Sequence, residues 1–485
     1  MQTFLIYLGF AILAVLALLL LLLLFAFLRT LAMKKKESVY PLQDGQKERE
    51  KKYAELLARM VRCETVSSER AVHAEKFERF HQLLHELFPH VFQSGPAIVE
   101  SFDHNLLIRW PGQSHEKPVV LMAHQDVVEA KGTWIYPPFS GEIADGKVWG
   151  RGSADTKCSL MAIFQALDEL MASGYTPPQD VYVCSSCTEE WSGGGGPRLA
   201  AILKERGIRP FLLCDEGGGI IRDPMPGITG CYAMIGVLEK GRADVRFTAR
   251  GHGGHASAPP KHSPIARLAS FINRVETHSP FRRTLTREVR AMFRSLAPYS
   301  GFGMRFVFAN LWLFALPLKW ILPKLSAQAG AMIQTTVAFT TMQGSDGYNV
   351  LPQEASVGAN LRYAAHQGEK ETLEILKRMA ADEDLEMEVI RSNDASRPIA
   401  LNGEAFRFFE RTVERVFPGM AYSPYVIPMA TDAYNFEGVC DTCLRFAPLV
   451  YGQEQLKGMH GLDENVEIVG LPGAVDFYKA LIRGE

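Results

Sequence analysis

The sequence predicts an α/β protein of two lobes, preceded by a helix that spans a membrane. Three observations support this prediction: an uncharged apolar segment at the N-terminus, alternating strand-like and helix-like segments over residues 53–236, and a different order of elements over residues 237–392. The chain has 485 residues, which is more than one hydrophobic core usually holds, so two domains are expected.

The N-terminal segment from Thr3 to Leu28 contains 26 residues without a charge. As a helix, it is long enough to cross a bilayer core of about 30 Å. A cleaved signal peptide would have a shorter apolar region preceded by basic residues, whereas here Arg29 and Lys34 to Lys36 follow it. We therefore expect a single-pass anchor over residues 1–30 and an exposed, charged tether over residues 31–52. The basic flank favours a cytoplasmic position for the remaining chain, but the side of the membrane stays open.

The larger lobe is expected to comprise residues 53–236 and 393–485. Three apolar runs within it are short enough to be buried strands: Val119 to Met122, Val181 to Ser186 and Phe211 to Cys214. Ser159 to Ser173 has the character of a helix between two of them. Such alternation favours a mainly parallel central sheet, and functional groups of these sheets collect at the carboxyl ends of the strands.

The smaller lobe, residues 237–392, has the order strand, helix, strand, strand, helix, strand, which is typical of a ferredoxin-like unit. It contains additional apolar material at residues 278–332. The uncharged run there is interrupted by Pro317 and ends at Lys319, so it is too short to span a membrane readily. Two interpretations remain open: a buried or dimer-facing helical pair, or an apolar surface for a lipid-like substrate or the bilayer.

Composition narrows the classes of partner. The formal charge of −2 and the absence of a basic stretch in the folded part give no reason to expect nucleic acid. The eight cysteines are not spaced as a disulfide framework, and we expect reduced thiols. Two C-x-x-C pairs, Cys184/Cys187 and Cys440/Cys443, are interpreted as buried apolar residues rather than halves of a structural zinc site.

Five motifs fall where strands are expected to end: "AHQD" (His124, Asp126), "GRGSADTK" (Asp155), "CTEEWSGGGG" (Glu189, Glu190), "CDEGGG" (Asp215) and "MHGLDE" (His460). An unpaired buried charge is costly, so such groups gather around cations or around each other. Two imidazoles with several carboxylates suit zinc, which accepts nitrogen and oxygen ligands at about 2.0–2.2 Å.

Together and in this order, the motifs resemble those of the M20 family of dizinc amidohydrolases, which includes carboxypeptidases, aminoacylases and N-acyl-amino-acid hydrolases. The resemblance extends from about Tyr53 to the C-terminus and implies an α/β zinc-peptidase catalytic domain interrupted by a lid and dimerisation domain. It implies two zinc ions per subunit. The implied ligands are Asp155 as the bridge, His124 and Asp215 at one zinc, and Glu190 and His460 at the other.

The resemblance also implies roles around the metals. Asp126 would hold the second ring nitrogen of His124 and so fix its tautomer. Glu189 would take a proton from a metal-bound water and pass it to the departing amine. His255, in "GHGGHASAPP", would stabilise the oxyanion, often from the partner subunit of a homodimer; His252 is the alternative candidate.

Two residues of "NVLPQEASVGANLR", Asn349 and Arg362, resemble the substrate-binding pair of the family. Arg362 can pair bidentately with a free α-carboxylate, although a salt bridge within the lid would also explain it. Thr431 and Asp432 resemble a loop that borders the pocket, and no chemical role is assigned to them.

These features predict a membrane-anchored dizinc hydrolase that cleaves an amide bond next to a free α-carboxylate. The substrate would be an N-acyl amino acid or a peptide, with a slight preference for an apolar acyl group, as in the carboxypeptidase S-like and N-fatty-acyl-amino-acid hydrolase branch. The alternative is a membrane-tethered binding or scaffold protein that has lost catalysis. Such a loss would replace Glu189 or a metal ligand, and each of these positions holds a competent residue.

Overall fold

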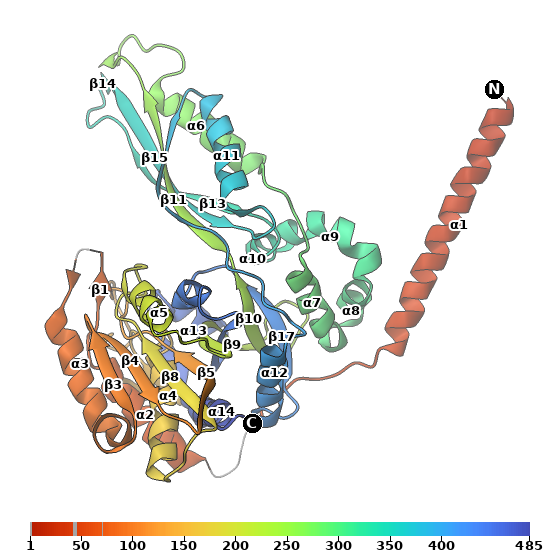
Figure 1. The fold of residues 1–485 in the computed structure, drawn as a ribbon. Coiled ribbons are helices and arrows are strands. Elements are labelled where there is room, and N and C mark those ends of the chain that lie inside the picture. Colours follow the sequence, from red (N-terminus) through yellow and green to blue (C-terminus); the bar gives the residue numbers. More distant parts are fainter. Residues whose placement is uncertain (1, 42–45, 70) are drawn as a thin grey trace.

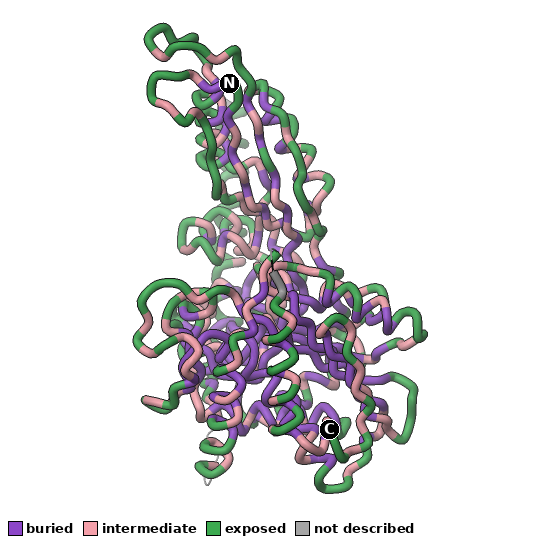
Figure 2. The backbone as a smooth tube through the Cα atoms, turned by 90° about the vertical axis from the view of Figure 1, so that its left-hand side faces the viewer, coloured by how far each residue is buried: buried purple, intermediate pink, exposed green. Residues whose placement is uncertain are grey.

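The computed structural model describes residues 2–41, 46–69 and 71–485. A body built on a large sheet carries a smaller sheet that projects from it, and helix α1 (Gln2–Ala32) extends away from both, with only its last turns in contact with the rest of the protein (Figure 1). Buried residues are concentrated in the body, whereas the projecting unit is largely half-buried or exposed (Figure 2).

The large sheet is mixed rather than mainly parallel as the sequence suggested. Its eight strands follow the order β17 (Ala421–Ile427), β10 (Cys231–Glu239), β18 (Cys443–Tyr451), β9 (Leu212–Arg222), β5 (Ser114–Met122), β8 (Gln179–Ser185), β4 (Asn105–Trp110) and β3 (Ile98–Phe102). The pairs β18–β9, β9–β5 and β5–β8 are parallel, while β8–β4 and β4–β3 are antiparallel. The β3–β4 hairpin is closed by Asp103 and His104, both at positive φ, as tight hairpin turns require.

Alternating side chains of the central strands pack on opposite faces of the large sheet. In β5, Val119 and Leu121 join the main core, while Val120 and Met122 join a second cluster. The main core is completed by helices α2 (Lys47–Val61), α4 (Lys157–Ala172), α12 (Glu404–Val416) and α14 (Leu471–Arg483). The second cluster contains residues of α5 (Gly195–Glu205) and of the short helix η3 (Asp432–Phe436). Because both faces are covered, strand apolarity is continuous rather than alternating.

The projecting unit is a four-stranded antiparallel sheet of order β13 (Thr336–Gln343), β15 (Glu354–Tyr363), β11 (Gly241–Arg250) and β16 (Glu386–Asn393). Helices α6 (Pro264–Thr277) and α11 (Gly368–Ala381) pack on it through a separate core that includes Phe247, Phe271 and Leu376. The element order is the one expected from the sequence. Strand β11 follows β10 after Lys240 alone, so the two sheets meet at this residue.

Between α6 and β13 lie helices α7 (Arg287–Leu296), α8 (Phe302–Ala309), α9 (Leu311–Leu325) and α10 (Ala327–Ala331). Helix α7 buries Val289, Met292, Phe293 and Leu296 in the main core. The remaining elements are β1 (Ser67–Ser68), β2 (Ala71–Val72), α3 (Ala74–Leu87), β6 (Glu142–Ala144), β7 (Lys147–Trp149), β12 (Gly254–His255), β14 (Val350–Leu351), α13 (Gln453–Gly458), β19 (Asn465–Glu467), the π-helix His90–Ser94 and the 3₁₀ turns Ala297–Tyr299 and Ile468–Gly470.

Among the described residues, α1 is the one unbroken helix long and apolar enough to cross a membrane; the candidate span is Thr3–Ala32, and its most apolar 18 residues have a mean hydropathy of 3.3. Membrane spans and signal sequences share this character. The segment after it is not a fully exposed tether. Ser38 is buried; its hydroxyl donates to the Cys231 carbonyl and accepts from the Ala421 backbone N–H.

Candidate metal centre and active site

The motif residues come together at the ends of the elements that carry them. His124 lies two residues after β5, and Asp155 lies two residues before α4. Glu190 follows β8, Glu216 lies within β9, and His460 lies between α13 and β19. These residues are separated by up to 336 positions in sequence, so the topology of the sheet rather than local structure brings them together.

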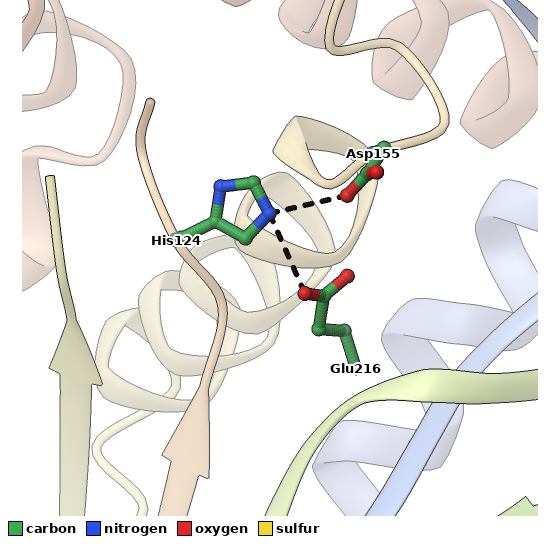
Figure 3. A group of neighbouring side chains, drawn as sticks. All are labelled: His124, Asp155 and Glu216. Atoms are coloured by element: carbon green, nitrogen blue, oxygen red, sulfur yellow. Dashed lines mark hydrogen bonds and ion pairs between the residues drawn. The ribbon is translucent and has the colours of Figure 1, made fainter. Parts of the chain in front are cut away.

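The first group consists of His124, Asp155 and Glu216, whose ligand atoms all lie within 4.8 Å of one another. The Nε2 atom of His124 is 3.1 Å from Oδ1 of Asp155 and 3.5 Å from Oε1 of Glu216. Figure 3 shows this nitrogen facing both carboxylates, with the rest of the ring directed away. The arrangement leaves one nitrogen and two oxygens directed toward a common point.

The second group consists of Asp155, Glu190 and His460. The Nε2 atom of His460 is 3.1 Å from Oδ2 of Asp155 and 2.9 Å from Oε2 of Glu190. Asp155 therefore belongs to both groups and presents a different oxygen to each. A carboxylate with this placement can bridge two cations.

The structure does not bring Asp215 into either group. Its Oδ2 atom accepts a hydrogen bond of 2.9 Å from the backbone N–H of Ala433, on the side of the sheet where Leu213 packs. Neighbouring residues in a strand point to opposite sides, so Glu216 is the residue directed toward His124. Glu216, the next residue, therefore stands in this group in place of the expected Asp215. The sequence offers both carboxylates in "CDEGGG", but it does not reveal which face of β9 holds the site.

The chemistry of the donors fits divalent zinc. Two imidazole nitrogens and three carboxylates form a set of borderline and hard ligands that zinc accepts. The Oε1 atom of Glu190 is buried and has no hydrogen-bond partner, although burial of an unpaired carboxylate oxygen is costly. Among the described residues, the ion-pair partners of Asp155, Glu190 and Glu216 are histidines, with no lysine or arginine within 4.0 Å. A bound cation would supply the missing positive charge.

The pKa values of the residues in the two groups reflect the same shortage of positive charge around the carboxylates. Burial, followed by the charge of Asp155, raises the pKa of Glu190 to about 7 and that of Glu216 well above its usual range. Burial alone would raise the pKa of Asp155, but hydrogen bonds from the two imidazoles lower it. Hydrogen bonds to Asp155 and Glu190 raise the pKa of His460 to about 10. The ligand set is therefore electrostatically costly without a cation.

Asp126 lies where it can orient His124. The Nδ1 atom of His124 is 2.9 Å from the backbone oxygen of Asp126 and 3.4 Å from its Oδ1 atom. The carboxylate of Asp126 also accepts from the Ser67 hydroxyl and from the backbone N–H groups of Glu189 and Glu190, each at 3.2 Å. One buried side chain thereby connects the His124 ring to the loop that carries both glutamates.

Glu464 is a positioning residue to which the sequence analysis assigned no role. Its buried carboxylate accepts from the backbone N–H groups of Gly152, Ala154 and Asp155 and from the guanidinium of Arg151. These contacts fix the loop that presents Asp155. The acidic pair at the end of "MHGLDE" is the only sequence signal for it, and such pairs usually lie on surfaces.

Glu189 belongs to neither group, although it is the neighbour of Glu190 in sequence, and it borders a cavity of about 240 Å³. The cavity is also lined by Lys240, Arg242, Thr431 and Asp432, and so lies where the two sheets meet. Burial, opposed by the charge of His124, raises the pKa of Glu189 well above its usual range. A carboxyl group with this character can exchange protons with a reactant in the cavity.

The predicted residues of the smaller lobe fall at its two ends. His255 in β12 pairs with Val350 of β14, beside Asn349, and all three are exposed. Figure 1 places β14 at the end of the projecting unit farthest from the large sheet. His252 lies on the same exposed loop. The structure therefore does not bring His255 or Asn349 to the metal groups of their own chain.

Arg362 lies at the opposite end of this unit, close to the cavity. It is directly across from Arg242 in the β11–β15 pairing. Burial and the charge of Arg242 lower the pKa of Arg362. The Nε atom of Arg242 is buried without a partner, while its terminal nitrogens contact Ser192 and Asp244. Two adjacent guanidinium groups, of which that of Arg242 lines the cavity, favour an anionic ligand.

The described cysteines are all free thiols, as the sequence suggested. Cys184 and Cys187 are buried, as are Cys440 and Cys443, and none of them belongs to a group that could hold a metal.

Comparison with known proteins shows the family of the chain. Residues 120–484 match Peptidase family M20/M25/M40. The N-fatty-acyl-amino acid synthase/hydrolase PM20D1 of Xenopus tropicalis is 32% identical over 90% of the chain and 86% of that protein. The probable carboxypeptidase S-like 2 of Dictyostelium discoideum is 29% identical over 89% of the chain and 84% of that protein.

Solved structures share the fold. The M20 family metallo-carboxypeptidase Sso-CP2 of Sulfolobus solfataricus superposes with a TM-score of 0.65 at 17% identity, covering 89% of this chain and 98% of that one. Human carnosine dipeptidase 1 gives 0.62 at 16% identity, covering 90% and 97%. With the shared carboxylate, the two histidines and the α/β body in place, the chain is a metallohydrolase of the M20 peptidase family.

Proposed function

We propose that this protein is a membrane-anchored dizinc hydrolase that cleaves an amide bond adjacent to a free α-carboxylate. The observation that carries the proposal is Asp155, whose two oxygens contact His124 and His460 separately, beside a cavity bordered by Glu189. His124, Asp155 and Glu216 would hold one zinc ion, and Asp155, Glu190 and His460 the other. Helix α1 would be the anchor.

The bound ions would polarise the scissile carbonyl and lower the pKa of the attacking water. Glu189 takes the proton that the water loses as its oxygen bonds to the carbonyl carbon. It then gives this proton to the amide nitrogen as the C–N bond breaks, so that a carboxylic acid and a free amine leave. Asp126 and Glu464 act through the residues that they hold, by fixing the His124 ring and the Asp155 loop.

The substrate is recognised by its carboxylate. Arg362, supported by Arg242, would bind this group at the junction of the sheets, opposite Glu189. His255 and Asn349 would act on the oxyanion and substrate from the smaller lobe of a partner subunit, because in their own chain they lie at its far end.

Between the two substrate classes, we favour N-acyl amino acids with an apolar acyl group. The names of two relatives support opposite choices, a fatty-acyl-amino acid hydrolase and a carboxypeptidase. The apolar helices α8 and α9 and the membrane-type helix α1 favour the amphiphilic substrate, since such molecules partition to membrane surfaces.

The proposal is tested by hydrolysis assays on the full chain in detergent, with N-fatty-acyl amino acids, their α-carboxamides and dipeptides compared side by side. Chelation should abolish turnover and zinc should restore it. Glu189→Gln should retain zinc but lower kcat by about 10²–10⁴-fold, whereas the same change at exposed Glu205, at the end of α5, should have little effect. Turnover that survives chelation, or an unchanged rate in Glu189→Gln, would contradict the mechanism.

A further inference from the structure

Helices α8 and α9 form a bent pair with an uncovered apolar face. The chain bends by 111° between them, at Asn310. Between 44% and 71% of the surface remains exposed for six large apolar residues: Phe302, Trp312, Leu316, Trp320, Ile321 and Leu325. Contiguous apolar surface of this kind marks an interaction site.

This hairpin, residues 302–325, is joined to the last turns of α1. The side-chain amide of Asn310 donates to the Ala26 carbonyl at 3.2 Å and to the Thr30 hydroxyl at 3.0 Å, and all three residues are fully buried. Aromatic pairs flank this contact: Phe25 with Trp312 at 6.1 Å between ring centroids, and Phe27 with Phe302 at 5.8 Å. The apolar face therefore continues directly from the helix that would enter the bilayer.

The charges around the hairpin suit a lipid surface. No acidic residue occurs between Glu288 and Asp346, while Lys319 and Lys324 lie on α9. The guanidinium of Arg283 lies 4.9 Å from the Trp320 ring centroid. Exposed tryptophans next to lysine and arginine are typical of the membrane–water interface, where aromatic rings and basic groups meet lipid headgroups.

The dimensions exclude a second span. Helix α8 has 8 residues and α9 has 15, which at 1.5 Å per residue gives about 12 and 22 Å. Both are shorter than a hydrocarbon core of about 30 Å. We propose that the hairpin is embedded in the leaflet next to the C-terminal end of α1, as a second membrane contact with the lipid bilayer as its partner. This proposal rests on the insertion of α1 into the bilayer and is separate from the hydrolytic reaction.

This contact would also set the position of the cavity. The Nζ atom of Lys240, which lines the cavity, donates to the carbonyls of Ala331 and Gln334, directly after the hairpin, at 3.0 and 2.9 Å. A hairpin held in the leaflet therefore keeps the cavity near the membrane surface, where an acyl substrate would be delivered.

The experiment uses the full chain in vesicles of phosphatidylcholine, with or without bromine on the acyl chains. Bromine quenches tryptophan on contact. The wild type should lose up to about one third of its emission, because two of the six tryptophans lie on the hairpin. The Trp312→Phe/Trp320→Phe variant should lose this quenching, whereas Trp134→Phe, in the body, should keep it.

A second pair of variants controls for surface polarity. Leu316→Glu/Leu325→Glu should reduce the quenching at least twofold, whereas Ile135→Glu should not, although Ile135 is exposed to a similar extent, 67%. Quenching that persists in the double tryptophan variant would overturn the proposal. Absence of quenching in protein that floats with the vesicles would also overturn the proposal. So would an oligomer that the leucine substitutions disperse while quenching stays absent, since a second copy of the chain would then cover the apolar face. If the protein does not float with the vesicles, α1 is not inserted and the proposal is overturned. Hydrolysis in detergent would be unaffected by this result.

Discussion

Asp155 is the residue on which the proposed centre depends, because its two oxygens contact the imidazoles of His124 and His460, which are 336 positions apart in the sequence. Glu464 fixes the backbone around Asp155. Its carboxylate accepts hydrogen bonds from the backbone N–H groups of Gly152, Ala154 and Asp155. Side chains in such sites need positions within about 0.5 Å of the productive geometry, so the residues that hold the loop are as necessary as the ligands.

Substitutions at the neighbouring carboxylates of β9 should separate their roles. We expect Glu216→Gln to lower the zinc content from two ions per subunit to one, because a neutral amide is a poor zinc ligand. Asp215→Asn should retain both ions, because its side-chain oxygen can still accept the Ala433 N–H. Metal analysis of the purified variants checks this, and the reverse pattern would return Asp215 to the ligand set.

At the scale of elements, β18 and β10 are connected by a buried ion pair. Arg445 on β18 and Glu239 at the end of β10 are at most 1% exposed, with Nε and Oε1 2.6 Å apart. The Thr431 hydroxyl also donates to Oε1 of Glu239. This pair lies where β10 ends and the projecting sheet begins, so it stabilises the junction on which Lys240 and Arg242 are placed.

Removal of the positive charge of Arg445 should destabilise this junction. Arg445→Met leaves Glu239 buried without its countercharge, and a loss of roughly 3–5 kcal/mol in the free energy of unfolding is expected. The double variant Arg445→Met/Glu239→Gln should recover a large part of it. Denaturant unfolding of the full chain measures both.

The exposed pair Arg246–Glu388, with side chains 53% and 63% exposed, serves as the control. Arg246→Met should change the stability by less than about 1 kcal/mol, because solvent screens surface pairs. Equal effects at the two sites would contradict the importance given to burial.

At the scale of the whole molecule, the two sheets keep parts of the proposed machinery far apart. The two candidate metal-binding groups and Glu189 lie at the large sheet, whereas His255 is exposed at the far end of the projecting unit. A symmetric dimer can bring the end of one subunit over the site of the other, and a twofold interface would complete both sites at once.

Mixed dimers test this arrangement. Glu189→Gln and His255→Ala should each be nearly inactive alone. In a random mixture, half of the dimers combine the two chains, and one site in each has both Glu189 and a partner's His255. Activity should therefore recover to about a quarter of the wild-type value. No recovery on mixing, with dimers present, would mean that His255 acts within its own chain, and full activity of His255→Ala alone would mean that it has no role.

The sequence by itself determined the identities and order of the chemical groups and the main elements. The expected helix Ser159 to Ser173 corresponds to α4, Lys157–Ala172, and the expected strand Val181 to Ser186 corresponds to β8, Gln179–Ser185. These features depend on local apolar patterns, which are visible in single segments. His124, Asp155, Glu190 and His460 were predicted as metal ligands because their motifs, taken together and in order, resemble those of the M20 family.

Only the tertiary structure decided which way the side chains face and what lies next to them. It placed Glu216 rather than Asp215 beside His124, made the large sheet mixed, moved His255 away from the metal groups of its own chain, and joined the 302–325 hairpin to α1. Each of these outcomes depends on pairing between distant segments: a shift of one residue in a strand reverses the face of a side chain, and no local pattern specifies the partner of an exposed apolar surface.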